Sequence, residues 1–129
     1  MKKKILIVMS NYYQSISEGL LKSAKQVLNK PFDLILVPGV FEIPMTIAKN
    51  IKKYDGFIAL GCVIKGETPH FDYISKAAIN GIMKLSIESK KPIGNGIITC
   101  LNKNQALARR KKGREAAKAM ISLLDISKK

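Results

Sequence analysis

Four short apolar runs punctuate the chain, and each is bounded by polar or turn-forming residues. Runs that are apolar throughout, rather than alternating with polar residues, are typical of strands covered on both faces of a parallel sheet. We therefore predict four strands, at Lys4–Met9, Phe32–Val37, Phe57–Leu60 and Ile97–Leu101.

The segments between these runs carry apolar residues at helical spacing. After the first run, Ile16, Leu20 and Ala24 recur every four residues, and Pro31 ends the pattern. The same reasoning predicts four helices, with Gly113 able to interrupt or kink the last: Gln14–Asn29, Glu42–Lys53, His70–Lys90 and about Lys103–Leu124.

A strand followed by a helix, repeated four times, favours a parallel sheet with helices on both faces. The chain has 129 residues, which is the usual size of one domain. We therefore predict a single flavodoxin-like three-layer α/β/α domain over residues 1–129, with a doubly wound, four-stranded parallel sheet.

The loops after the first three strands should meet at one edge of this sheet, because parallel strands end on the same side. Open sheets of this kind bind ligands in the crevice outside those carboxyl ends. The sequence has no GxGxxG after its first strand and no GxxxxGK[ST], so we expect neither a dinucleotide site nor a P-loop. The three loops are Ser10–Tyr13, Pro38–Glu42 and Gly61–His70.

The first two loops carry residues suited to a flat, hydroxylated ligand. Tyr12 can stack on a heterocycle while its hydroxyl stays in water, or can simply pack on its neighbour at the rim. Glu42 can accept hydrogen bonds from sugar hydroxyls, or can serve only the dipole of the helix that begins there.

The third loop carries residues suited to a phosphate and to proton transfer. The Thr68 hydroxyl and the N–H groups of Gly66 and Glu67 can cradle an anion, and the following helix offers further free N–H groups. His70 is the only histidine of the chain, and its ordinary pKa of about 6.5 suits proton transfer near neutrality. The alternative is a histidine without chemistry, either on the surface or satisfied within the core.

The net charge of +14 favours anionic partners. Its one dense cluster runs from Arg109 to Arg114, and it is read as a solvated surface, a phosphate site or a nucleic-acid contact. Aromatic residues are not interleaved with the cluster, which weakens the nucleic-acid interpretation. We expect no nucleic-acid partner.

Neither the apolar runs nor the cysteines indicate export or a membrane. No run is long enough to span a bilayer, and the apolar stretch Ile5–Met9 is too short for a signal peptide. Cys62 and Cys100 have no metal or redox spacing and are predicted to be reduced, buried thiols, with a catalytic Cys62 as the alternative. We expect a cytoplasmic protein with no membrane partner.

At this point the chain resembles the 6,7-dimethyl-8-ribityllumazine synthase family of riboflavin biosynthesis. The likeness covers nearly the whole chain, and GETPHFDY within the second motif is its most specific part. The motifs are VPGVFEIP (Val37–Pro44), YDGFIALGCVIKGETPHFDYIS (Tyr54–Ser75), NGIITC with NQALAR (Asn95–Arg109) and KGREAA (Lys112–Ala117).

The resemblance implies a cofactor-independent transferase without a metal. It would condense 5-amino-6-(D-ribitylamino)uracil with 3,4-dihydroxy-2-butanone 4-phosphate and release phosphate and water. It also implies a homopentamer or a multiple of one, with sites between subunits.

The resemblance further assigns roles to residues. His70 would be the proton shuttle, and Arg109 would bind the phosphate, with Arg110 or Lys112 as alternatives. Asn95 would line the heterocycle from a neighbouring subunit. The other substrate-binding positions would be Tyr12 (stacking), Val40, Phe41 and Glu42 (ribityl chain), Val63 and Ile64 (pyrimidine edge), and Gly66, Glu67 and Thr68 (phosphate).

Three rival functions remain open on the sequence. One is an archaeal-type riboflavin synthase, which shares the fold but acts on two lumazines. The second is a shell-forming or flavin-binding scaffold without turnover, and the third is a nucleic-acid-binding domain. GETPHFDY argues against the first, and the joint presence of Glu42, Thr68, His70 and Arg109 against the second.

Overall fold

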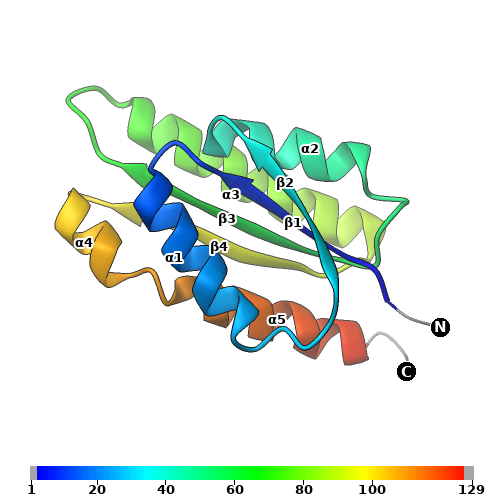
Figure 1. The fold of residues 1–129 in the computed structure, drawn as a ribbon. Coiled ribbons are helices and arrows are strands. Elements are labelled where there is room, and N and C mark those ends of the chain that lie inside the picture. Colours follow the sequence, from blue (N-terminus) through cyan, green and yellow to red (C-terminus); the bar gives the residue numbers. More distant parts are fainter. Residues whose placement is uncertain (1–2, 127–129) are drawn as a thin grey trace.

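A single parallel sheet organises the chain in the computed structural model, which describes residues 3–126 (Figure 1). Four strands lie in the order β2-β1-β3-β4, and every neighbouring pair is parallel. The two strands in the middle, β1 and β3, are buried along nearly their whole length. The strands are β1 (Ile5–Ser10), β2 (Phe32–Val37), β3 (Gly56–Ile64) and β4 (Ile93–Cys100).

Helices cover both faces of the sheet and make three layers, so the predicted fold class is confirmed. Figure 1 shows α1 and α5 on one face and α2 and α3 on the other. The helices are α1 (Gln14–Lys25), the short 3-10 helix η1 (Val40–Glu42), α2 (Ile43–Lys49), α3 (His70–Ser89), α4 (Lys103–Ala108) and α5 (Lys112–Ile126). Among residues 3–126, no helix is long and apolar enough to cross a membrane.

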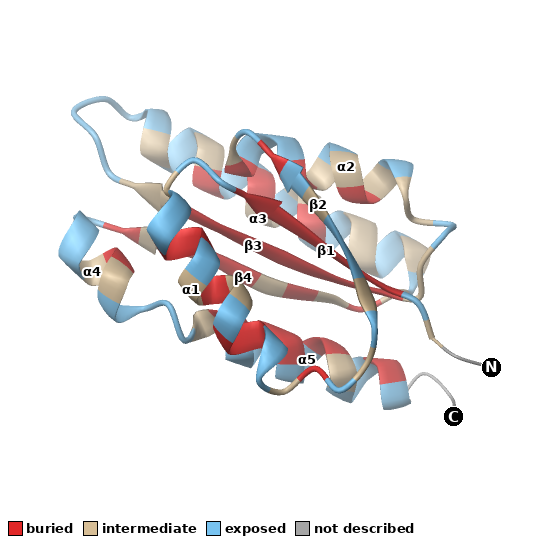
Figure 2. Ribbon diagram, in the orientation of Figure 1, coloured by how far each residue is buried: buried red, intermediate tan, exposed pale blue. Residues whose placement is uncertain are grey.

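Alternate residues of β1 feed two separate cores, as the period of a strand requires. Ile5, Ile7 and Met9 pack with α1 and α5, whereas Leu6 and Val8 pack with α2 and α3. Figure 2 shows β1 and β3 as the most buried strands, whereas the edge strand β2 is largely exposed. This double burial explains why the run ILIVM (Ile5–Met9) is apolar throughout.

Two strands are longer than predicted. β3 continues through Gly61 to Ile64, where the sequence analysis placed a loop, and β4 begins at Ile93 instead of Ile97. The register pairs Phe57 with Ile93 and continues to the partners Ile64 and Cys100. The glycines in these segments hid the strands, since glycine is depleted in strands in general.

Three predicted helices differ at their ends. α1 ends at Lys25 rather than Asn29, and the helix predicted at Glu42–Lys53 is η1 followed by α2, which ends at Lys49. The helix predicted at Lys103–Leu124 is two helices, α4 and α5.

Ser23 of α1 holds the break between α4 and α5. Its hydroxyl donates to the carbonyl of Arg110 (2.9 Å) and accepts from the N–H of Arg114 (3.1 Å). Gly113 lies directly against α1, where a Cβ atom would collide with the carbonyl of Leu20. The interruption therefore lies just before Gly113, and the glycine serves a close approach of two helices.

Candidate active site

The ends of three strands meet at the carboxyl edge of the sheet, as the sequence predicted. The N–H of Asn11, after β1, donates to the carbonyl of Val37 at the end of β2 (3.2 Å). Gly61 of β3 lies so near that a Cβ atom there would stand 2.5 Å from the Ser10 hydroxyl and 2.8 Å from Val40. Only glycine lets β1, β3 and η1 come this close.

Tyr12 is presented to solvent from this edge by its neighbour. Its ring is 74% exposed and meets Tyr13 edge-on, with ring centroids 4.9 Å apart and planes at 84°. Tyr13 is half-buried and packs on the core, and burial, with Tyr12 second, raises its pKa. Tyr13 therefore anchors an exposed aromatic platform, a role that the sequence analysis did not assign to it.

The turn after β2 presents Phe41 and Glu42 and buries Val40. Val40 is 4% exposed and Phe41 is 58% exposed, so η1 is fixed by the first and displays the second. The exposed Glu42 carboxylate lies over Gly39, where a Cβ atom would stand 3.1 Å from Oε1. η1 packs against α3, which brings this turn beside the histidine-bearing helix.

The end of β3 passes into an exposed loop. Val63 and Ile64 are half-buried and pair with Thr99 and Cys100 of β4. Gly66, Glu67 and Thr68 follow in a loop that projects beyond the sheet, exposed to solvent along its length (Figure 2). A Cβ atom added at Gly66 would meet nothing within 4 Å.

His70 is the first residue of α3, and its ring is exposed. Its N–H donates to the Thr68 hydroxyl (3.4 Å), which ties the loop to the start of the helix. Pro69 caps the helix without a side-chain hydrogen bond. The N–H groups of Asp72 and Tyr73 in this first turn donate to the Pro69 carbonyl, so an anion in the Gly66–Thr68 loop would meet the helix start mainly through the N–H of Phe71.

Asn95 and Arg109 lie apart from these residues, along the outer strand β4. Asn95 is within the strand, where its side-chain oxygen accepts from the N–H of Ile97 (3.0 Å). Arg109 ends α4 and donates from Nη1 to the carbonyl of Thr99 (3.2 Å). β4 is an edge strand of the sheet, and both of these hydrogen bonds lie along it.

The two alternative phosphate ligands are engaged elsewhere. Arg110 donates from Nε to the carbonyl of Leu107 (2.9 Å), and its side chain packs over Gly19. Lys112 forms an ion pair with Glu115 (3.6 Å). Arg109 and Lys112 both line an open hollow of about 460 Å³ beside β4, whereas Arg110 does not.

Cys62 and Cys100 lie close together on β3 and β4, although they are distant in sequence. Both are buried free thiols, as predicted. Burial, with Cys100 as a second cause, raises the pKa of Cys62 to about 12. Such a thiol is not a nucleophile at neutral pH, which argues against the catalytic alternative. Residues 3–126 contain no cluster of histidine, cysteine or acidic side chains that could hold a metal ion.

This flavodoxin-like α/β fold carries exposed aromatic, acidic and histidine side chains beyond the carboxyl ends of its strands, which places the chain in the class of α/β proteins that can bind small molecules at that edge. The profile of the 6,7-dimethyl-8-ribityllumazine synthase family matches residues 2–128. The chain belongs to this family, whose members are transferases of riboflavin biosynthesis.

Named relatives cover almost the full chain. The chain is 42% identical to the 6,7-dimethyl-8-ribityllumazine synthase of Bartonella tribocorum, over 100% of this chain and 94% of the relative. It is 40% identical to that of Agrobacterium fabrum, over 99% and 97%. The relative from Zymomonas mobilis is 40% identical, over 98% and 97%.

Proposed function

We propose that this chain condenses 5-amino-6-(D-ribitylamino)uracil with 3,4-dihydroxy-2-butanone 4-phosphate to give 6,7-dimethyl-8-ribityllumazine, phosphate and water. The observation that carries the proposal is the meeting of the first three strand ends at one edge, with Gly61 closing the gap between Ser10 and Val40. A ring, a polyol chain and a phosphate can then lie side by side.

The heterocyclic substrate occupies the part of the edge nearest β1 and β2. Tyr12 stacks on the pyrimidine, since its ring is exposed and held by Tyr13. The backbone of Val63 and Ile64 reads the pyrimidine edge. Phe41 and Glu42 line the ribityl chain, and the buried Val40 fixes them in place.

The phosphorylated ketone occupies the loop at the start of α3. Gly66, Glu67 and Thr68 surround the phosphate, and the N–H groups of the helix start add to its binding. His70 follows within two residues of Thr68, so its ring lies beside the carbon chain that reacts. It transfers the protons that imine formation and phosphate loss require.

This division of labour suits the reaction. The substrates themselves supply an amine nucleophile, a carbonyl and a good leaving group, so the protein mainly has to hold them together. Positioning of two reactants can lower a barrier by roughly 7–11 kcal/mol, and one general acid–base adds about 10²–10⁴-fold. A single histidine without a nucleophilic side chain is then sufficient.

A neighbouring subunit completes the site. Tyr12, Glu42 and His70 are all exposed, so one chain does not enclose a substrate. Asn95 and Arg109 lie on the open edge of β4 and can reach a second copy's crevice, where Arg109 would bind the phosphate. We therefore propose a homo-oligomer, a pentamer or a multiple of it.

An apolar face supports this assembly. Phe41, Met45, Met83 and Ile87 on η1, α2 and α3 are 58%, 64%, 59% and 66% exposed. Phe41 and Met45 line an open groove of about 520 Å³ between α2 and α3, and Met83 and Ile87 lie on α3 outside it. Large exposed apolar patches mark protein interfaces, and this one lies next to the η1 end of the site.

A cytoplasmic location also fits. Cys62 and Cys100 are neighbouring buried thiols that remain free, as in a compartment that keeps thiols reduced.

The purified protein, mixed with both substrates, tests the function directly. We expect fluorescent lumazine and inorganic phosphate to appear in equal amounts. Neither product should form when either substrate is omitted. Conversion of added lumazine to riboflavin, without condensation of the two precursors, would instead assign the chain to the riboflavin synthase reaction.

A further inference from the structure

Lysines precede every strand at the amino end of the sheet, opposite the candidate active site. They are scattered in the sequence, and only the parallel topology gathers them. Because all four strands begin on the same side, the residues before each strand share one pole of the molecule. They are Lys3 and Lys4 before β1, Lys30 before β2, Lys52 and Lys53 before β3, and Lys90 and Lys91 before β4.

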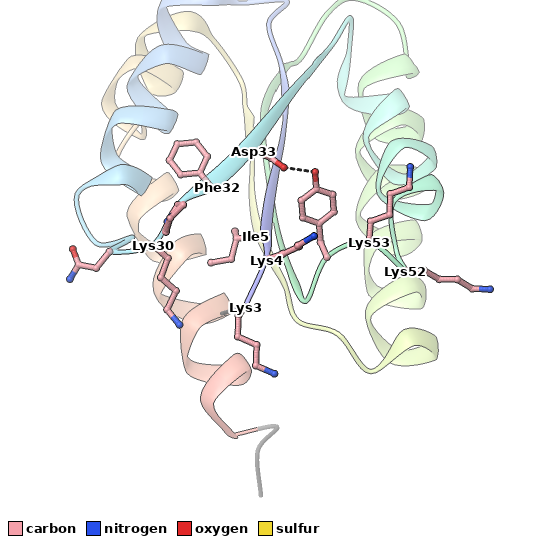
Figure 3. Close-up of a pocket in the computed structure, with 11 residues that line it drawn as sticks. Lys3, Lys4, Ile5, Lys30, Phe32, Asp33, Lys52 and Lys53 are labelled. Carbon is pink, nitrogen blue, oxygen red and sulfur yellow. Dashed lines mark hydrogen bonds between the residues drawn. The ribbon is translucent and has the colours of Figure 1, made fainter. Parts of the chain in front are cut away.

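Five of these lysines line one open hollow of about 880 Å³ around the start of β1 (Figure 3). Among residues 3–126, the only acidic residue that lines it is Asp33, and Phe32, Pro31 and Tyr54 give it apolar walls. The volume falls within the range of small-molecule sites. We call this hollow, lined by Lys3, Lys4, Lys30, Lys52 and Lys53, the amino-pole pocket.

The nearby carboxylates accept hydrogen bonds from neutral donors rather than from the ammonium groups of these lysines. Asp33 accepts the hydroxyl of Tyr54 (2.6 Å), and Asp55 accepts the backbone N–H of Lys4 (2.7 Å). The hydrogen bond to Asp33 also raises the pKa of Tyr54, which keeps this donor protonated. Across residues 3–126 the one side-chain ion pair is that between Lys112 and Glu115 on α5.

One lysine of this pole, Lys91, has a structural role that the five pocket lysines lack. The ammonium group of Lys91 donates to the carbonyl of Ile51 (2.6 Å), just after α2, where a cation complements a helix end. The ammonium groups of the five pocket lysines make no such contact with any described residue. A structural role in capping therefore accounts for Lys91 and not for them.

We propose that the amino-pole pocket binds a polyphosphorylated small molecule. Five lysines around one concave site suit an anion with several charges in a row, since their long side chains can turn toward different phosphates. The site is separate from the substrate phosphate loop: a strand of six residues, about 20 Å at ~3.3 Å per residue, lies between the two ends of β1.

Two probes distinguish the source of the phosphates. Adenosine triphosphate carries a polyphosphate chain and a base, whereas inorganic tripolyphosphate carries the chain alone. Binding of each to the whole protein would be measured by calorimetry at physiological salt, where diffuse attraction between exposed charges is largely screened. Equal affinity for the two probes would mean that the pocket recognises the polyphosphate chain alone. Tighter binding of the nucleotide would mean that the apolar walls also contact the base. Both results support the pocket.

Matched variants locate the site. Lys30→Gln with Lys53→Gln removes two charges from the pocket and should weaken binding of either probe at least tenfold. Lys76→Gln with Lys118→Gln removes two charges from exposed positions on α3 and α5, outside the pocket, and should change affinity less than twofold. All four side chains are at the surface, so circular dichroism should show an unchanged fold.

Three results would overturn the proposal. One is the absence of saturable binding of both probes. Another is an equal loss of affinity in the two double variants, which would mean attraction to the general charge of +14. The third is loss of binding in Arg109→Ala with retention in the pocket variant, which would place the anion at the candidate active site.

Discussion

His70 owes its position to the two residues before it and to the helix that it begins. The Thr68 hydroxyl receives its N–H, so the ring is directed by a short turn rather than by packing. Replacing the ring should therefore affect chemistry more than folding. In the proposed mechanism this ring carries the proton transfers of the condensation.

We predict that His70→Ala lowers kcat by roughly 10²–10⁴-fold, the usual contribution of a general acid–base, with little change in KM for either substrate. Steady-state rates of lumazine formation across the pH range would measure this. A rate equal to that of the parent protein at every pH would remove His70 from the mechanism.

Arg109 and Arg110 provide a matched pair for the phosphate assignment. Arg109→Ala should raise KM for the butanone phosphate by about 10- to 100-fold, because a charge-assisted hydrogen bond contributes about 1.5–3 kcal/mol. Arg110→Ala should leave KM within about twofold, because its guanidinium bonds to the Leu107 carbonyl and its aliphatic carbons pack over Gly19 of its own chain. The reverse pattern would mean that Arg110, and not Arg109, binds the phosphate group of the substrate.

The buried thiol Cys62 should be inert in the folded protein. Its pKa is raised to about 12 by burial, so at pH 8 it is protonated and a thiol reagent should label it only after denaturation. The pKa of Cys62 is higher in the folded protein, about 12, than in the unfolded protein, where it is near 9. The protonated thiol therefore stabilises the fold fully below pH 9, and this contribution is lost as the pH rises toward 12. Urea unfolding of Cys62→Ala should depend less steeply on pH in that window; an unchanged slope would show that Cys62 does not titrate there.

At the scale of elements, the apolar runs predicted the order of the strands and helices along the chain, but the glycines made the limits of two strands hard to predict. Phe32–Val37 was predicted with its observed limits because it is apolar and bounded by prolines. The ends of β3 and β4 were missed, since GCVI and IGNG read as loops until their pairing is known. The break between α4 and α5 depends on Ser23, which is far away in sequence and invisible to a local pattern.

The contact between α1 and α5 gives a test at this scale. Gly113→Ala places a methyl group against the Leu20 carbonyl and should cost about 1–3 kcal/mol, the usual effect of overpacking. Gly66→Ala is the control, because a Cβ atom there meets nothing within 4 Å. Urea unfolding would show a lower midpoint for the first and a nearly unchanged one for the second. Equal midpoints would mean that the helices part without cost.

For the whole molecule, the apolar face on α2 and α3 decides whether the site can be completed. Met45→Glu should dissociate the assembly and abolish condensation while the chain stays folded, because it puts a charge into the proposed contact. Leu123→Glu changes an equally apolar exposed residue on α5 and should leave both intact. Light scattering coupled to size exclusion would measure the mass. An assembly lost only in Leu123→Glu would move the interface to α5.

From the sequence, some of the proposed site residues could be grouped within one chain, but the position of the others relative to them could not be predicted. Tyr12, Glu42 and His70 could be grouped because each follows a strand, and parallel strands end together. Asn95 and Arg109 follow no such rule, and their common edge on β4 emerges only with the strand order. The lysines of the amino-pole pocket likewise lie far apart in the sequence, and only the strand order brings them together.

One feature of the sheet sets the shape of the binding edge. β3 last pairs with β1 at Leu60, yet it runs on to Ile64 alongside β4 alone, a further rise of about 13 Å. The phosphate loop is therefore carried on a two-stranded extension that projects beyond the ends of β1 and β2 at Ser10 and Val37. Deleting one paired residue from each of β3 and β4 would shorten this extension by about 3.3 Å, so the distance of the loop from the rest of the edge is set by strand length and not by the loop itself.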